Sequence, residues 1–336
     1  MNRRWICNDV WMDILPSFER VELGLKMALI SDRFDVLVDA HFDGKMTELT
    51  LWREITIRKG IEPESKLFVW LGDKWVDFPL PNRPLPNKIR FKNLRIEYID
   101  HSVIAFLRAN KQIWDRIGTN LGCCLLKNEN VQPIWDVLAS EIWPIFATNI
   151  RNLGFVSDNH LDNLLRRISP TILTDLDQLN SIDFAILYSF MIYDQILSKW
   201  LHTPSKNGQP KRLRCWSRNE SRTKEWINNL KDVAFLRATS SVSYIIRIDH
   251  VRTIPTEPFE LVNERTNEKL ILWKKSEYNW LLKRCPIIVG ETAVQWESDK
   301  NLNANLNNVK FNLWRGINCI GPLLPPAERR KRKRDE

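Results

Sequence analysis

From residue 88 to about residue 248 the chain alternates short apolar strand-like segments with helical segments. No other feature of the sequence constrains the fold as strongly, because each strand–helix pair is too small to bury its apolar face alone. Intervals of 31, 28, 26, 34 and 31 residues separate six marker positions: Leu94, Leu125, Leu153, Leu179, Leu213 and Tyr244. The pattern predicts a mixed α/β fold in which successive strand–helix units stack on one another.

The period lies in or just above the range of leucine-rich repeats, in which one strand and one helix per unit form a solenoid. The leucine and asparagine spacing of that consensus is poorly kept over 88–250. An ordinary domain of alternating strands and helices, with coincidental spacing, therefore stays open as the alternative. We expect an irregular leucine-rich-repeat-like stack.

Antiparallel strands are predicted on both sides of this stack. Lys66–Leu71 and Trp75–Phe78 form a hairpin across a short turn, and a proline-rich connector follows within 43–87. Within 255–290, three strands separated by Asn267-Glu268 and Ser276-Glu277 form a meander that could cover the open end of the stack. Residues 301–336 are expected to be a C-terminal extension.

The first 42 residues are predicted to form a separate module of three helical segments. Asn8 and Asp9 are suitable caps for the first segment, and Pro16 limits its length. The apolar stripes contain Val10, Trp11, Ile14, Leu15 and Phe18, then Val21, Leu25 and Leu29, then Phe34, Leu37 and Val38. So small a module buries this surface only against the rest of the chain or against another protein. The alternative is that these helices are an ordinary part of one common core.

The order and spacing of these residues resemble an F-box. Ile6–Leu15 is similar to the family's opening Leu-Pro-x-Glu-x-Leu-x-x-Ile-Phe, and Met27–Phe34 to its later Leu-x-Leu-x-x-Val-Cys-x-x-Trp. Cys7 stands in place of the usual Pro and Phe34 in place of Trp, and one extra residue separates the halves. GQPKRL (208–213), PFELVNERTNEKL (258–270) and WLLKRCPI (280–287) also resemble the F-box-associated region of large nematode F-box families.

This resemblance implies a non-catalytic substrate receptor of an SCF-type ubiquitin ligase, which docks on the adaptor Skp1 within a cullin complex. Residues 43–300 would then form the domain that binds a protein substrate. The residues implied to contact Skp1 are Ile6, Val10, Trp11, Ile14, Leu15, Phe18, Leu25, Leu29 and Phe34.

Residue types that carry catalysis or bind metals are sparse. The 5 histidines are scattered singly, and the 6 cysteines form no C-x-x-C pair. Only 11 glycines are present, and the sequence has no phosphate-binding loop, nucleophile elbow or zinc spacing. We therefore expect no enzyme activity, no cofactor and no metal. No apolar run reaches membrane-spanning length, and the N-terminus lacks the apolar region of a signal peptide, so we expect no membrane partner.

An uninterrupted basic run close to the C-terminus supplies six units of the +9 formal charge. Such a run predicts a nuclear import signal, or otherwise a solubilising or phosphate-binding tail. We expect the protein in the cytoplasm, the nucleus or both. A nuclear scaffold that binds protein or nucleic acid is the alternative function, although nucleic acid is the less favoured partner. The residues are Arg329, Arg330, Lys331, Arg332, Lys333 and Arg334.

Overall fold

A computed structural model of the chain forms two compact units, Met1–Phe146 with Arg315–Glu336, and Ala147–Trp314. The residues that it describes are 6–45, 51–52, 55–60, 65–71, 74–86, 90–91, 93–114, 120–126, 132–155, 158–184, 190–205, 208–216, 220–249, 257–287 and 309–316. The expected domain boundaries after residues 42 and 300 both fall inside these units, and they stay predictions. Within the described part, no helix is long and apolar enough to cross a membrane.

The N-terminal residues form the expected helical segments. These are α1 (Asn8–Ile14), a 3₁₀ turn at Leu15–Ser17, α2 (Arg20–Glu22), a π turn at Leu23–Met27 and α3 (Asp32–Lys45). Pro16 lies in the 3₁₀ turn that ends the first helix, as its fixed backbone angle predicts. The module has a core of its own, formed by Leu15, Leu23, Ala28, Leu37, Val38 and Phe42.

The first unit also contains a sheet with strand order β7-β6-β2-β3-β4. Its strands are β2 (Ile55–Lys59), β3 (Ser65–Leu71), β4 (Lys74–Pro79), β6 (Asn93–Ile96) and β7 (Asn120–Leu126). The hairpin β3–β4 is antiparallel, as expected, although β4 begins at Lys74 rather than at Trp75. Strands β2, β6 and β7 pair in parallel with one another. A two-stranded parallel sheet joins β1 (Leu51–Trp52) to β5 (Arg90–Phe91).

Helices follow the parallel strands of this unit. They are α4 (His101–Ala109), α5 (Lys111–Trp114) and a continuous run of α6 (Gln132–Val137), a π turn (Leu138–Ile142) and α7 (Trp143–Phe146). The predicted apolar face of the long run is buried at Trp135, Leu138, Ile142, Ile145 and Phe146. Burial of this face, rather than helix propensity alone, stabilises the run.

The second unit has the strand order β12-β13-β14-β11-β10-β9-β8-β15. Strands β8 (Ile150–Phe155), β9 (Ser181–Phe184), β10 (Lys211–Trp216) and β11 (Tyr244–Asp249) are parallel. A ladder of side chains, each at most 1% exposed, crosses the sheet through Leu153, Ile182, Leu213, Ile246, Leu282 and Leu272. The ladder is the core that positions these strands.

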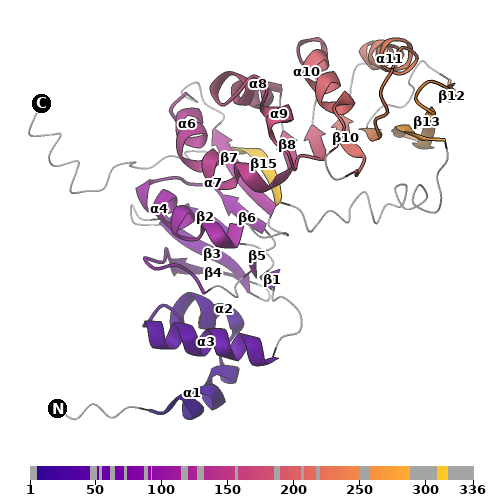
Figure 1. Cartoon of the computed structure of the whole chain (residues 1–336). Coiled ribbons are helices and arrows are strands. Elements are labelled where there is room, and N and C mark those ends of the chain that lie inside the picture. The colour runs from indigo at the N-terminus through magenta and orange to yellow at the C-terminus, as the bar shows by residue number, and fades with distance from the viewer. Residues whose placement is uncertain are drawn as a thin grey trace, which may run out of the picture. The chain divides into compact units, whose positions relative to one another are not determined.

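A helix or helices follow each of β8, β9 and β10. They are α8 (Asp158–Arg167), α9 (Ile172–Asp175), α10 (Phe190–His202) and α11 (Glu220–Asn229), the last extended by a π turn at Leu230–Phe235. Figure 1 shows α8, α10 and α11 on the same side of the strands. Side chains alternate along a strand, so the residues next to those of the ladder point to the opposite face, which we call the open face.

Three antiparallel strands complete one edge: β12 (Phe259–Asn263), β13 (Glu268–Ser276) and β14 (Asn279–Pro286). The expected meander is therefore present, with β14 antiparallel to β11. Its turns differ from the prediction, because Glu268 and Ser276 belong to β13. The prediction also lacked β15 (Val309–Gly316), which pairs in parallel with β8 and lies within the expected C-terminal extension. The fold is mixed α/β.

Candidate functional site

An apolar stripe on the N-terminal module is open to solvent. Ile6, Val10 and Phe18 are 47%, 46% and 36% exposed, and Ile14 is partly exposed. These four residues recur every four positions, and Val10 and Ile14 lie on one face of α1 because a helical turn takes 3.6 residues. All four belong to the residues predicted to contact a partner protein.

The other predicted contact residues are buried or partly buried, and Leu15, Trp11 and Phe34 belong to or pack against the module's own core. Leu15 and Leu25 are buried, at 0% and 4% exposed, while Trp11, Leu29 and Phe34 are partly buried. The rings of Trp11 and Phe34 pack edge to face, with centroids 4.8 Å apart. The sequence pattern placed Leu15 beside Ile14 on one face, but successive helical residues are about 100° apart, and Leu15 belongs to the core.

A polar clamp joins the two ends of this module. The Arg33 guanidinium on α3 donates from Nη2 to Asn8 Oδ1 at 2.7 Å and to the Ile6 carbonyl oxygen. Asn8 was predicted to cap α1, but Cys7 holds the N-cap position without a side-chain cap. The amide oxygen of Asn8 accepts a hydrogen bond from Arg33, which is 25 residues away. No local sequence pattern predicts this contact.

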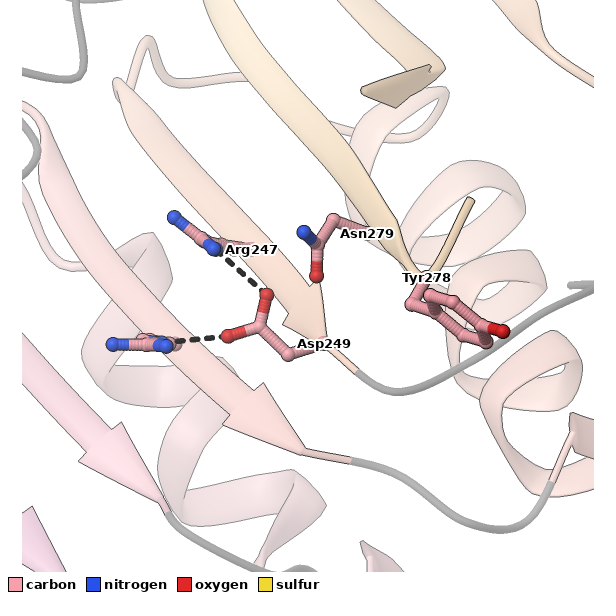
Figure 2. A pocket seen from close by; sticks show the side chains of 5 residues that line it. Arg247, Asp249, Tyr278 and Asn279 are labelled. Atoms are coloured by element: carbon pink, nitrogen blue, oxygen red, sulfur yellow. Dashed lines mark hydrogen bonds and ion pairs between the residues drawn. The ribbon is translucent and has the colours of Figure 1, made fainter. Parts of the chain in front are cut away.

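A pocket of about 430 Å³ lies at the carboxyl ends of β10 and β11. Figure 2 shows Arg247 and Asp249 on β11, with Asn279 at the start of β14 and Tyr278 in the turn before it. Arg214, on β10, completes the lining. Clefts beyond the carboxyl ends of parallel strands are common ligand sites, because chain connections diverge there.

Asp249 organises this pocket. Its side chain is 3% exposed, and its two oxygens accept from Arg214 Nε and Arg247 Nε, both at 2.7 Å. Trp216 Nε1 donates to the same carboxylate at 3.1 Å. With its amide oriented to suit its neighbours, Asn279 donates to Asp249 Oδ1 at 2.7 Å. A buried carboxylate is stable only when paired and hydrogen-bonded, and these four donors meet that requirement.

A second polar cluster lies inside the same unit. Arg284 and Glu268, 1% and 0% exposed, form an ion pair of 2.6 Å. Near them, burial raises the pKa of Tyr244 to about 12 and lowers the pKa of His202. Burial also lowers the pKa of Lys211, on β10, to about 8. Lys211 is only 5% exposed and Tyr244 is 0% exposed, so we interpret the cluster as part of the interior rather than a place where substrate binds.

A third feature is a cavity of about 270 Å³ between the N-terminal module and the proline-rich connector. Asp32, Asp35 and Arg83 line it, and burial together with the charge of Asp32 raises the pKa of Asp35. Across the described ranges, no group of three or more His, Cys, Asp or Glu side chains is placed to hold a metal ion. The basic run Arg329–Arg334 lies outside the described residues.

Comparisons with protein-family models, with characterised proteins and with solved structures find no match for this chain. Its function is therefore inferred from its residues and their geometry, together with the F-box resemblance of the sequence.

Proposed function

We propose that this protein is a non-catalytic substrate receptor of an SCF-type ubiquitin ligase, which docks on Skp1 through its N-terminal module. The receptor would hold a protein substrate so that a conjugating enzyme carried by the cullin complex reaches the substrate's lysines. Such an assembly accelerates the reaction by proximity, because two reactants held in the right geometry react as one molecule.

The exposed stripe Ile6–Val10–Ile14–Phe18 is the observation that carries this proposal. A module of this size has its own small core, yet it leaves four apolar side chains at a regular spacing on its surface. Exposed apolar residues that gather on one surface mark interaction sites in soluble proteins, and Val10 and Ile14 share one face of α1. They occupy the positions that the F-box resemblance assigns to adaptor contact.

The register of the second unit supports a receptor role for the rest of the chain. The ladder residues Leu153, Ile182, Leu213 and Ile246 are spaced by 29, 31 and 33 residues along the chain. A near-constant spacing favours the leucine-rich-repeat-like stack, in which variable side chains on repeated strands line a binding face. We assign substrate binding to this unit.

Val10→Asp tests the docking surface. Val10 is in the first turn of α1, where an added carboxylate is compatible with the helix dipole, so the module should remain folded. At an apolar interface the unpaired charge would cost several kcal/mol. Capture by purified Skp1 should therefore fall at least about tenfold.

Val36→Asp is the matched control, because Val36 lies on α3, is 68% exposed and is outside the predicted contact set. It should bind Skp1 as the wild type does. If Skp1 captured the wild type and the Val10→Asp variant equally, the F-box assignment would be wrong. Substitution of Leu15 would not serve, because a charge at a fully buried core position unfolds the module regardless of any partner.

A nuclear scaffold is the second candidate function, and the basic run Arg329–Arg334 is the observation that favours it. The same capture experiment separates the two, since a scaffold of this kind has no need of Skp1. If the scaffold acts on nucleic acid, its binding should weaken steeply with added salt, because phosphate contacts release counterions.

A further inference from the structure

The pocket around Asp249 lies on the open face of the second unit. Leu213 and Ile246 belong to the buried ladder, so the next residues along the strands, Arg214 and Arg247, point the other way. These two arginines are register partners on neighbouring strands. Their side chains are 43% and 23% exposed, so both are accessible from solvent.

Most of the donor capacity of these two guanidinium groups is unused. Each holds Asp249 through Nε alone. Within the part of the chain that the structure describes, their terminal nitrogens have no hydrogen-bond or ion-pair partner. A guanidinium carries five N–H donors in a rigid plane, so each terminal pair can hold the two oxygens of one planar anion. Because Asp249 already holds both arginine side chains in place, little side-chain conformational entropy is lost when an anion binds to them.

The charge of the pocket selects the anion. Among the residues that line the pocket, two guanidinium charges face one carboxylate, so a single further negative charge balances the lining. We propose that this pocket binds a carboxylate from an acidic segment of the protein substrate, an inference that rests on the proposed receptor function. A phosphate group carries −1.5 to −2 charges near neutral pH and would overcompensate the pocket.

The size and rim of the pocket agree with a side chain rather than a bare ion. A volume of about 430 Å³ exceeds that of a carboxylate group and leaves room for the carbon atoms that carry it. Tyr278 is 38% exposed at the rim, where its ring offers an apolar surface to those carbons. A glutamate or aspartate side chain with its neighbouring backbone fits this description.

The test measures binding of an acetylated, amidated hexaglutamate peptide by calorimetry, with hexaglutamine and a phosphoserine-containing hexaglutamine as comparison peptides. The protein is the full chain with the six residues 329–334 changed to Ala, because a basic run attracts acidic peptides by itself. Hexaglutamate should bind at least about tenfold more tightly than either comparison peptide, since each charge-assisted contact strengthens binding substantially.

Arg214→Lys and Arg247→Lys keep the charge beside Asp249 but remove the planar fork, and each should weaken hexaglutamate binding at least about fivefold. Arg166→Lys is the matched control, because Arg166 is an exposed arginine on α8 of the same unit that pairs only with Asp162 among the described residues. It should leave binding unchanged. Equal binding of the glutamate and glutamine peptides, preference for the phosphoserine peptide, or unaltered affinity of both pocket variants would overturn the proposal.

Skp1 capture by the same variants distinguishes the pocket from the receptor role. Arg214→Lys and Arg247→Lys should retain full capture, because the exposed stripe is untouched. If wild-type protein captures Skp1 but does not bind hexaglutamate, the pocket assignment fails alone. If it binds the peptide through the arginines but does not capture Skp1, the receptor role fails, and the carboxylate site stands without its substrate assignment.

Discussion

Lys211 is a buried lysine, and burial of its charged amine costs free energy. Its side chain is 5% exposed, Nζ donates to the Trp200 carbonyl oxygen and the same atom lies 5.1 Å from the Trp200 ring centroid. Burial lowers the pKa of this amine to about 8 from its ordinary value of 10.5. The charged form is therefore destabilised inside the folded protein, and the two Trp200 contacts only partly offset that cost.

Lys211→Met should raise the free energy of unfolding at pH 7 by roughly 1–3 kcal/mol, because it removes the buried charge at similar volume. Thr203 N still donates to the Trp200 carbonyl in the variant. Between pH 8 and 10.5 the unfolded state binds more protons at this lysine than the folded state does, so wild-type stability rises with pH. The advantage of the variant should therefore shrink as pH rises through this window.

Urea unfolding of both proteins at pH 7 and pH 9.5 measures this change. Lys199→Met, at an exposed position on α10, is the control and should shift stability by less than about 0.5 kcal/mol at either pH. A variant advantage that grew with pH would contradict the expected burial of a charged amine.

Some individual residues were predictable from the sequence and others were not. Ile182, Leu213 and the other apolar ladder residues follow from periodicity, whereas Glu268 was predicted to lie with Asn267 between two strands. Asn267 does adopt a positive φ of 53°, but Glu268 begins β13 and is fully buried against Arg284. Arg214, Arg247 and Asp249 were also missed as a group. Their proximity depends on strand register, and no local pattern encodes it.

At the scale of the element, Asp100 ties a helix to a strand. Its Oδ1 accepts from the Val103 backbone N–H at 2.9 Å and caps α4, while Oδ2 accepts from the Ser65 hydroxyl of β3 at 2.7 Å. Both Asp100 and Ser65 are buried, at 3% and 5% exposed. The cap follows from an Asp that precedes an apolar helix, but the contact with a residue 35 positions away does not.

Asp100→Ala should lower the free energy of unfolding by at least about 2 kcal/mol, because it removes the cap and leaves the Ser65 hydroxyl buried without its acceptor. Asp100→Asn should lose much less, since its amide oxygen can still cap α4 and its nitrogen can meet the Ser65 oxygen. Thermal melts of the three proteins measure the difference. Equal loss in both variants would show that charge, rather than hydrogen bonding, fixes this corner.

The presence of a helix or strand was predictable where amphipathic periodicity is strong. The register in which the strands pair was not predictable. The marker Leu179 lies just before β9, and Ile182 is the residue that aligns with Leu153 and Leu213. In the first unit the partner of Leu94 is Leu121 rather than Leu125. A side chain's strand partner depends on backbone pairing with distant segments, which a single sequence does not specify.

For the whole molecule, the parallel arrangement follows from the sequence alternation, because parallel neighbours require a crossover segment. Strand β15 was not predicted, since Val309–Gly316 follows a long polar stretch and its partner β8 precedes it by more than 150 residues. Its pairing returns the C-terminal part of the chain to the sheet. Contacts that close so large a loop leave no short-range signal.

The last prediction is that residues 43–336 fold without the N-terminal module. The module's core contains only its own residues. Its described contacts with the connector and hairpin include an exposed ion pair of 2.8 Å between Asp32 and Arg83, and Lys26 Nζ, 5.4 Å from the Phe78 ring centroid. An exposed ion pair contributes at most about 1 kcal/mol, so removal of this pair alone should lower the melting temperature by about 2–4 °C.

Calorimetry of the truncated chain should show a cooperative transition, and hexaglutamate binding to the Asp249 pocket should persist because every residue of that pocket lies in the second unit. The Asp32→Ala variant of the full chain is the control for the ion pair alone. Aggregation of the truncated chain, or loss of its cooperative transition, would mean that the three N-terminal helices are part of one folding unit with the sheet. In that case their exposed stripe could not be presented by a separable module, and the docking surface would have to be tested only by single substitutions such as Val10→Asp.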